Sequence, residues 1–348
     1  MPRLRVGVIG CGRAAQGIHL PILSRMVGVE IVAVAEPDRD LREAARRHVA
    51  RGAAVLADYR ELAERRDVDA VVVCLPNARH ADAAIAAFER GKHVYVEKPL
   101  ATSLPEAEQV LAAWQRSGVV GMMGFNYRFN RLYLSSRRLL AAAEIGELIA
   151  ACSVFSLAAD ELPAWKRTRQ TGGGALLDLG SHHLDLVGFL FGEPVTEVYA
   201  RLSSARTEDD TALVQWRLAG GLSGQSFFSL SAVNEERFEI YGQAGKLTVD
   251  RSRYQDAAIT RPARRWARAG SLWDAARSIE HAPYVWEKRR TPGHEPSHRV
   301  ALTRFVAAIV GQGQATPDLN DGYINLRILL AAERSAQAGR AVNALVAP

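Results

Sequence analysis

An apolar run followed at once by closely spaced glycines constrains the fold of this chain more than any other feature. Residues 4–9 are short and mostly apolar, and Gly10-Cys11-Gly12-Arg13-Ala14-Ala15 comes directly after them. This G-x-G-x-x-A pattern typically turns a buried parallel strand into a helix, because its glycines permit a tight turn and a close approach of backbone to a pyrophosphate. We therefore expect dinucleotide-binding contacts from Gly10, Cys11, Gly12, Arg13 and Ala14.

Predicted strands and helices alternate through the first third of the chain. We expect further buried strands at residues 29–35, 69–74, 93–96 and 119–124. Helices are predicted from about residue 13, over residues 41–50, 58–65 and 81–89, and from about residue 104 after Thr102 or Ser103 as N-cap. The alternation implies an α/β fold with a parallel, doubly wound sheet.

The pattern changes after about residue 125. A chain of 348 residues is long enough for two domains, which we place at residues 1–124 and 125–348. Short turns between strands indicate an antiparallel sheet in the second part. Strands are expected at residues 150–156, 196–202, 211–218, 223–231, 237–241 and 246–249, helices at 131–143, 175–191, 300–310 and 323–338, and an irregular stretch at 251–297.

Composition narrows the function classes. The net charge is +6, but the basic residues are nearly all arginines, and the densest cluster, Arg261 to Arg268, contains no nucleic-acid-binding motif. We expect no nucleic-acid partner, although the charge suits an anionic substrate. Three distant cysteines without a Cys-x-x-Cys pair indicate a reducing compartment. We expect no metal site. No signal peptide and no membrane-spanning apolar run is evident, so we expect a cytoplasmic protein.

Two segments follow strands of the predicted sheet, at the edge where such sheets bind ligands. Glu36 ends the second strand, and a carboxylate there would bind the adenosine ribose and repel a 2′-phosphate. The sequence therefore favours NAD over NADP, although Arg39 could weaken the repulsion and Glu36 could be a solvated turn residue. We also expect cofactor contacts after the strand expected at residues 69–74, from Leu75, Pro76, Asn77 and His80. His80 could instead cap or pack at a helix start.

Glu97-Lys98-Pro99 closes the strand expected at residues 93–96. The lysine would supply a positive charge at the sheet edge, where a substrate hydroxyl and a nicotinamide ring could meet. We count Glu97 and Lys98 among the expected cofactor contacts.

The helix expected at residues 175–191 carries acids and imidazoles within a largely apolar run, directly after Gly172-Gly173-Gly174. Asp178 and His182 are four residues apart and therefore share a helix face, which Asp185 continues. A surface ion pair would explain the spacing, but the apolar surroundings favour a site, and histidine suits proton exchange with an alcohol near neutral pH. His183 lies about 100° away around the helix and is excluded.

Taken together, these motifs resemble those of the Gfo/Idh/MocA oxidoreductases, the family of glucose-fructose oxidoreductase and inositol dehydrogenase. They occur in family order from the first strand to the central helix, whereas the region beyond Arg251 departs from the pattern. The matching segments are Gly10-x-Gly12-x-x-Ala15, Leu75-Pro76-Asn77-x-x-His80, Glu97-Lys98-Pro99, Gly124-Phe125-Asn126-Tyr127-Arg128-Phe129 and Gly173-Gly174-x-Leu176-x-Asp178-x-Gly180-x-His182-x-x-Asp185.

The resemblance implies an N-terminal Rossmann domain and a C-terminal α/β domain whose open, mostly antiparallel sheet forms homodimers or homotetramers. It implies that Lys98 lies near the nicotinamide, before a peptide bond to Pro99 that can be cis. It implies that His182 exchanges the substrate proton and that Asp178 binds substrate and orients the pair. Substrate contacts are also implied for Asn126, Arg128, Trp165 and Lys166.

The implied activity is NAD(P)-dependent, reversible hydride transfer at a secondary alcohol of a sugar, inositol or related polyol. His182 would act as general base, and Lys98 would donate a hydrogen bond to the same oxygen. Three alternatives stay open: a reductase of a nucleotide-linked keto-sugar, a glycosidase that uses tightly held NAD, and a non-catalytic dinucleotide-binding regulator.

Overall fold

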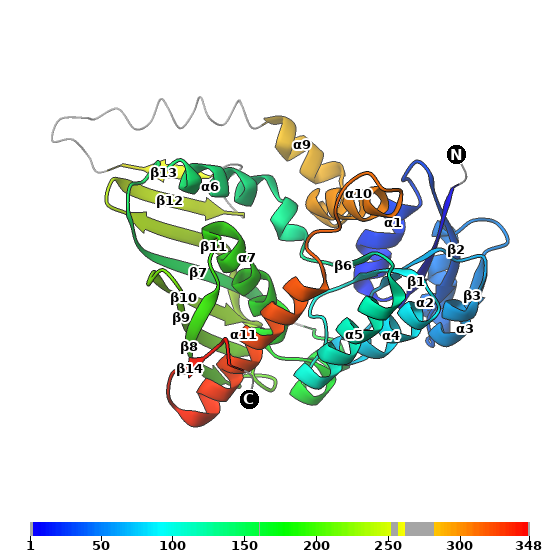
Figure 1. Cartoon of the computed structure of the whole chain (residues 1–348), viewed down its shortest axis with the longest axis horizontal. Helices are drawn as coiled ribbons and strands as arrows, with labels where there is room; N and C mark the ends of the chain where they lie inside the picture. The colour runs from blue at the N-terminus through cyan, green and yellow to red at the C-terminus, as the bar shows by residue number, and fades with distance from the viewer. Residues whose placement is uncertain (1–2, 160, 252–256, 262–281, 347–348) are drawn as a thin grey trace. The chain divides into compact units, whose positions relative to one another are not determined.

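The computed structural model describes residues 3–159, 161–251, 257–261 and 282–346. Contacts within the chain divide it into two compact units (Figure 1). The first unit comprises residues 1–126, 170–172 and 295–326, and the second comprises residues 127–169, 173–294 and 327–348. The chain therefore returns to its first unit near the C-terminus. The expected division at residue 124 does not include this return.

The first unit contains a six-stranded sheet in the order β3-β2-β1-β4-β5-β6. Every neighbouring pair is parallel, which confirms the doubly wound fold. The sequence analysis missed β3 because three residues are too few to show a period. The strands are β1 (Leu4–Ile9), β2 (Val29–Ala35), β3 (Ala54–Leu56), β4 (Ala70–Val73), β5 (His93–Val96) and β6 (Gly121–Met123).

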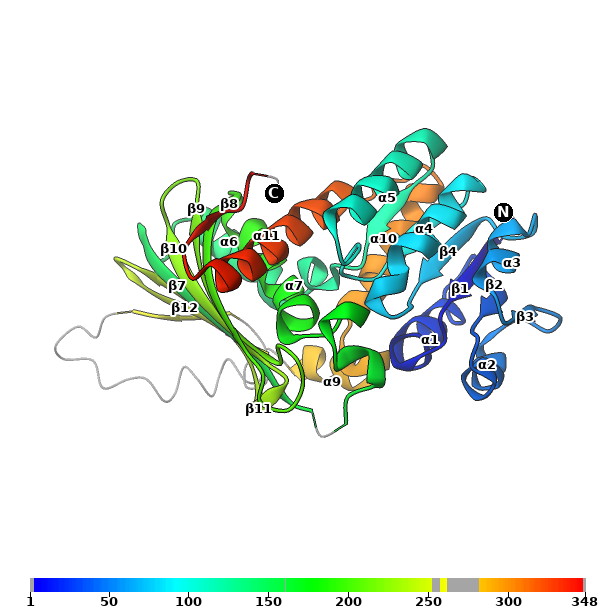
Figure 2. The same cartoon turned by 90° about the horizontal axis from the view of Figure 1, so that it is seen from below.

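Helices cover both faces of this sheet, and Figure 2 shows α4 and α5 on the opposite side from α1. A π-helical turn, Ala15–His19, precedes α1, so the helical segment after the glycine turn is irregular. Ser103 is the N-cap of α5 and forms a capping box with Glu106. The helices are α1 (Leu20–Leu23), α2 (Arg39–Ala45), α3 (Tyr59–Glu64), α4 (His80–Glu89), α5 (Leu104–Ser117) and α10 (Ser297–Ile309).

The second unit contains an eight-stranded sheet in the order β13-β12-β11-β7-β10-β9-β8-β14. It is mostly antiparallel as expected, but β7 and β10 are parallel. The stretch expected as one strand at residues 223–231 is divided between β10 and β11. The strands are β7 (Leu148–Ala158), β8 (Val195–Ser203), β9 (Thr211–Leu218), β10 (Ser223–Ser229), β11 (Ser231–Gly242), β12 (Gly245–Asp250), β13 (Ala258–Thr260) and β14 (Val342–Asn343).

Helices α6 (Arg131–Ala141) and α7 (Ser181–Phe191) lie on one face of this sheet (Figure 2). The other face carries exposed apolar side chains, including Ile149 at 62% and Leu213 at 55% exposure. The prediction of one regular helix over residues 175–191 is wrong in its first part, because a π-helical turn, Leu176–Gly180, precedes α7.

The stretch expected to be irregular, residues 251–297, contains regular elements in its described parts. These are β13 and α9 (Ala282–Arg290), and most of the arginine cluster at 261–268 lies outside the described residues. A last helix, α11 (Leu319–Ala338), begins in the first unit and ends in the second. None of the helices within the described ranges has both the length and the apolar character needed to cross a membrane.

Candidate active site

The glycine turn after β1 has the geometry that the motif requires. Gly10 adopts a φ of +89°, and a Cβ on it would lie 2.6 Å from the carbonyl oxygen of Cys74. A Cβ on Gly12, in contrast, would meet no protein atom within 4 Å. Only Gly10 is therefore required by the fold itself, whereas Gly12 leaves open space at the start of the following helix, where backbone N–H groups favour a phosphate.

Glu36, at the end of β2, lies directly beside this turn. Its carboxylate accepts hydrogen bonds from the backbone N–H of Cys11 at 2.8 Å and from that of Asp38 at 3.1 Å. The residue is only 8% exposed, so it is not the solvated turn residue that the sequence left open. Open space at Gly12 and a carboxylate at the adjoining strand end fit the pyrophosphate and ribose of NAD.

Cys11 and Cys74 are both buried and free of disulfides, as expected of small apolar residues. Burial, the Glu36 carboxylate and the neighbouring Cys74 raise the pKa of the Cys11 thiol to about 12. Cys11 is therefore a neutral packing residue, and its contribution to the turn comes from its backbone N–H.

Side chains after β4 bind backbone rather than solvent. Asn77 donates from Nδ2 to the carbonyl oxygen of Gly172 at 2.8 Å, so this amide serves a backbone contact. The two ring nitrogens of His80 lie 2.7 Å and 2.8 Å from the carbonyl oxygens of Pro99 and Leu75. Burial lowers the pKa of His80, and a neutral ring can donate to only one of the two. His80 thus supports the turn containing Pro99, and a direct cofactor contact from it stays a prediction.

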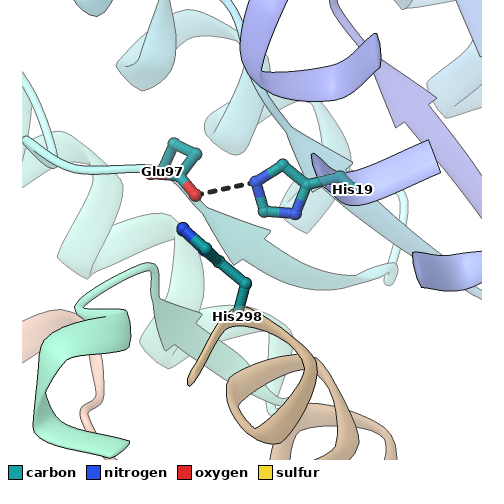
Figure 3. Close-up of side chains that lie close together, drawn as sticks. All are labelled: His19, Glu97 and His298. Carbon is teal, nitrogen blue, oxygen red and sulfur yellow. Dashed lines mark hydrogen bonds and ion pairs between the residues drawn. The ribbon is translucent and has the colours of Figure 1, made fainter. Parts of the chain in front are cut away.

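Glu97 and Lys98 follow β5, and the Lys98–Pro99 peptide bond is cis. The Glu97 carboxylate lies 2.8 Å from Nε2 of His19 and accepts the backbone N–H of Lys98 at 3.3 Å. Figure 3 shows His298, from α10, on the other side of the same carboxylate. Glu97 is thus hydrogen-bonded to the His19 imidazole, has the His298 imidazole beside it, and anchors the backbone that carries Lys98.

The charges in this group favour an ion pair. Burial opposes ionisation of Glu97, but the hydrogen bond and charge of His19, with the charges of His298 and Lys98, outweigh it and lower the pKa of Glu97 to about 2. Burial also opposes a charge on His19, yet Cys74 and Glu97 favour it, and the pKa of His19 is raised to about 10. One donor atom from each of His19, Glu97 and His298 lies within 4.8 Å of the others. The 2.8 Å between His19 and Glu97 is a hydrogen-bond distance, so these two residues form an ion pair.

Asn126, expected to contact substrate, is 1% exposed and donates from Nδ2 to Oγ of Ser297 at 2.9 Å. The structure therefore assigns its amide group to the start of α10. A direct substrate contact from Asn126 stays a prediction.

In the second unit, Asp178 lies in the π-helical turn and pairs with Lys166. The Lys166 Nζ to Asp178 Oδ2 distance is 2.5 Å, and the lysine ammonium also lies 5.3 Å from the ring centroid of Trp165. Three of the residues implied by the resemblance are thus neighbours. The carboxylate is 10% exposed as a side chain, so this ion pair is only partly open to solvent.

Arg128 and Asp185 form a second, more deeply buried pair. The guanidinium donates to both carboxylate oxygens, from Nη2 at 2.6 Å to Oδ1 and from Nε at 2.9 Å to Oδ2. Side-chain exposure is 19% for Arg128 and 2% for Asp185. Because a bidentate pair has a fixed geometry, Asp185 orients Arg128 at the start of the second unit.

His182 and His183 occupy different surroundings in the first turn of α7. The His182 ring stacks on the Tyr127 ring with centroids 4.5 Å apart. His183 is fully buried, 4.5 Å from the ring centroid of Phe238, and burial lowers its pKa. His183 is therefore part of the aromatic core, in line with its exclusion from the expected site.

A parallel sheet with this glycine turn and this acidic strand end defines a dinucleotide-binding unit of the Rossmann type. Residues 4–125 match the oxidoreductase family with an NAD-binding Rossmann fold, GFO_IDH_MocA, and residues 133–248 match the GFO/IDH/MocA C-terminal domain. The chain belongs to the Gfo/Idh/MocA family and is an NAD-binding oxidoreductase.

Similar proteins include curated enzymes. The chain is 32% identical to the dTDP-3,4-didehydro-2,6-dideoxy-alpha-D-glucose 3-reductase of Actinomadura kijaniata, over 71% of this chain and 75% of that one. It is 30% identical to the myo-inositol 2-dehydrogenase of Thermotoga maritima, over 74% and 78% of the two chains. A crystal structure of an oxidoreductase domain protein from Kribbella flavida superposes with a TM-score of 0.81, at 28% identity and 99% and 100% coverage.

Proposed function

We propose that the protein transfers a hydride between NAD and a secondary alcohol or ketone of a sugar, inositol or related polyol. The observation that carries the proposal is the acid–base group at the start of α7, where Asp178 pairs with Lys166 and His182 follows four residues later. Partly buried charges within an apolar helix are costly for stability, which favours a functional role. The names of the keto-sugar reductase and the inositol dehydrogenase support this substrate class.

In this proposal each side chain has a role that its chemistry permits. Bound NAD supplies the hydride acceptor. His182 takes the hydroxyl proton as general base, and Lys98 donates a hydrogen bond to the same oxygen. Asp178 binds substrate and orients the acid–base pair. Arg128, Trp165 and Lys166 also bind substrate hydroxyls in this proposal, and Asn126 is a further substrate contact.

The test is a screen for NADH fluorescence against polyols, sugars and sugar nucleotides, repeated with Lys98→Ala and His182→Ala on the best substrate. Loss of a positioned acid–base group lowers kcat about 10²-fold or more. We expect that loss of kcat in both variants, with a smaller change in the Kd for NADH. Lys246→Ala is the control, because Lys246 pairs with Glu239 on the second sheet. Near wild-type turnover in either active-site variant would remove its assignment.

Reduction of a nucleotide-linked keto-sugar is the second candidate. It is favoured by the 32% identity to a dTDP-keto-sugar 3-reductase and by the net charge of +6, which suits an anionic substrate. In that direction His182 returns the proton to the forming hydroxyl. The screen separates the two candidates. A polyol dehydrogenase produces NADH from NAD with a polyol or sugar, whereas a keto-sugar reductase consumes NADH with a nucleotide-linked keto-sugar.

We further propose a cytoplasmic homodimer or homotetramer. The exposed face of the second sheet supports self-association, because Ile149 and Leu213 are more than half exposed there. The free cysteines support a reducing compartment. Light scattering of the purified protein, with Leu213→Lys as the disrupting variant, measures the oligomeric state.

A further inference from the structure

The ring of His182 stacks on an aromatic ring to which no role has been assigned so far, that of Tyr127. The Tyr127 and His182 ring planes are 24° apart, and the centroids are separated by 4.5 Å. Tyr127 is 7% exposed and belongs to the 3-10 turn at Asn126–Phe129. A parallel stack at this distance restricts rotation of the imidazole about its Cβ–Cγ bond, so the position of the tyrosine ring determines where the histidine nitrogens point.

The same tyrosine ring contacts a cation. The guanidinium carbon of Arg251 lies 4.2 Å from the Tyr127 ring centroid, within the range of a cation–π interaction. Arg251 directly follows β12, and it is where the resemblance to the family motifs ends.

Glu236 fixes this arginine in turn. Nη1 of Arg251 lies 2.5 Å from both carboxylate oxygens of Glu236, and the Arg251 N–H donates to the Glu236 carbonyl at 3.1 Å. The pairing of Arg237 with Asp250 between β11 and β12 holds the two residues side by side. The side chains are 12% and 13% exposed, so solvent screens the pair little.

This arrangement supplies orientation more than charge. The Glu236 carboxylate neutralises the guanidinium, and Nε2 of His183 lies 3.9 Å from the same carboxylate. A neutral pair adds little net potential at His182. The pair therefore acts through its contacts. The paired strands β11 and β12 hold Arg251, Arg251 contacts the Tyr127 ring, and the Tyr127 ring stacks on the imidazole of His182.

We propose that Tyr127 is a positioning residue for His182 and that Arg251, held by Glu236, fixes the Tyr127 ring. The inference rests on the proposed role of His182 as the proton-exchanging residue. The competing explanation is packing alone, since Tyr127 also stacks on Tyr133 with centroids 5.7 Å apart. The two explanations differ in whether Tyr127 matters once His182 has been removed.

The experiment is a double-mutant cycle on kcat with the best substrate of the screen. Tyr127→Phe keeps the ring and is the matched control, expected within about twofold of wild type. Tyr127→Leu removes the ring and is expected to lower kcat about tenfold while KM and the Kd for NADH change less than about twofold. In the His182→Ala background, Tyr127→Leu should lower the residual kcat less than about twofold.

A second variant and a spectroscopic readout keep the test independent of folding and of substrate. Arg251→Met in the same cycle is expected to lower kcat a few-fold in wild type and not in His182→Ala. In ¹³C-histidine NMR, the His182 signal, assigned by its absence in His182→Ala, should move in Arg251→Met, which leaves the Tyr127 ring in place, but not in Tyr127→Phe.

Equal losses of kcat in the two backgrounds, or an unmoved His182 signal in Arg251→Met, would overturn the inference. Full activity of His182→Ala would instead overturn the proposed function, so the two failures are distinguishable.

Discussion

Gly10 and Gly12 are two residues apart, yet replacing them by alanine should affect different properties. The Gly10 substitution should lower the stability of the fold, and the Gly12 substitution should lower the affinity for NADH. Gly10→Ala places a side chain at a φ of +89° and a Cβ 2.6 Å from a backbone oxygen of Cys74. The left-handed conformation alone costs about 1–2 kcal/mol for an alanine. The backbone clash adds to it, because neither strand end can move without disturbing the sheet, and we expect a total loss of about 2–4 kcal/mol.

Gly12→Ala adds a Cβ that meets no protein atom within 4 Å. We therefore expect the free energy of unfolding to stay within about 0.5 kcal/mol of wild type. The added methyl group occupies the space through which a pyrophosphate approaches the backbone, so the Kd for NADH should rise at least about tenfold, or about 1.4 kcal/mol.

Thermal unfolding without cofactor and titration with NADH separate the two effects. Gly10→Ala should lower Tm by about 4–16 °C, given the loss of about 2–4 kcal/mol and about 2–4 °C per kcal/mol for a unit of this size. Gly12→Ala should leave Tm unchanged without cofactor and lose most of the Tm increase that NADH produces. Wild-type NADH affinity in Gly12→Ala, or wild-type Tm in Gly10→Ala, would refute the reasoning.

Three further predictions follow from other contacts. Arg128→Ala strands the buried Asp185 carboxylate and should lower the free energy of urea unfolding by about 3–5 kcal/mol, whereas combining it with Asp185→Leu should recover most of the loss. Glu36→Ser should raise the kcat/KM ratio of NADP to NAD about tenfold or more, with Glu43→Gln, a surface residue paired with Arg46, as an unchanged control. The pKa of Glu97 is lowered from 4.5 to about 2, so its stabilising contribution is complete above about pH 4.5 and is lost as the pH falls toward 2. The pKa of His19 is raised from 6.5 to about 10, so its contribution is complete below about pH 6.5 and is lost as the pH rises through 10. His19→Gln should therefore destabilise most between about pH 4.5 and 6.5, and a pH-independent difference from wild type in urea unfolding would contradict the ion pair.

The parts of the fold that could be predicted are those with local signals. Strand β4 is buried at every position, and the capping box of α5 is visible as Ser103 and Glu106. Strand β3 has three half-buried residues and gives no such signal. The π-helical turn before α7 was also hidden, because residues 176–180 are all buried, and a segment with no polar face shows no shift of its apolar pattern.

For the candidate site, sequence reasoning found the residues that carry motifs and missed those that support them. Glu36 could be placed beside the glycine turn because strand ends share one edge of a parallel sheet. His19 and His298 both lie beside Glu97 although they are 279 residues apart in the sequence, and neither belongs to a motif. The only sequence signal for His19 is that a histidine lies in a largely apolar first helix. Such a histidine is more often a hydrogen-bonded core residue than part of a functional site. Arg251 and Glu236 are joined only by the pairing of two strands, which residue types alone do not reveal.

The return of residues 295–326 to the first unit has a consequence for biosynthesis. Phe305 of α10 packs against Tyr95 of β5, and both are at most 1% exposed. While the ribosome is still making the second unit, Tyr95 has no such cover, so the parallel sheet cannot finish its core until nearly the whole chain has emerged. A fragment ending at residue 124 should accordingly be aggregation-prone. Most of the chain must be translated before the first unit can fold completely.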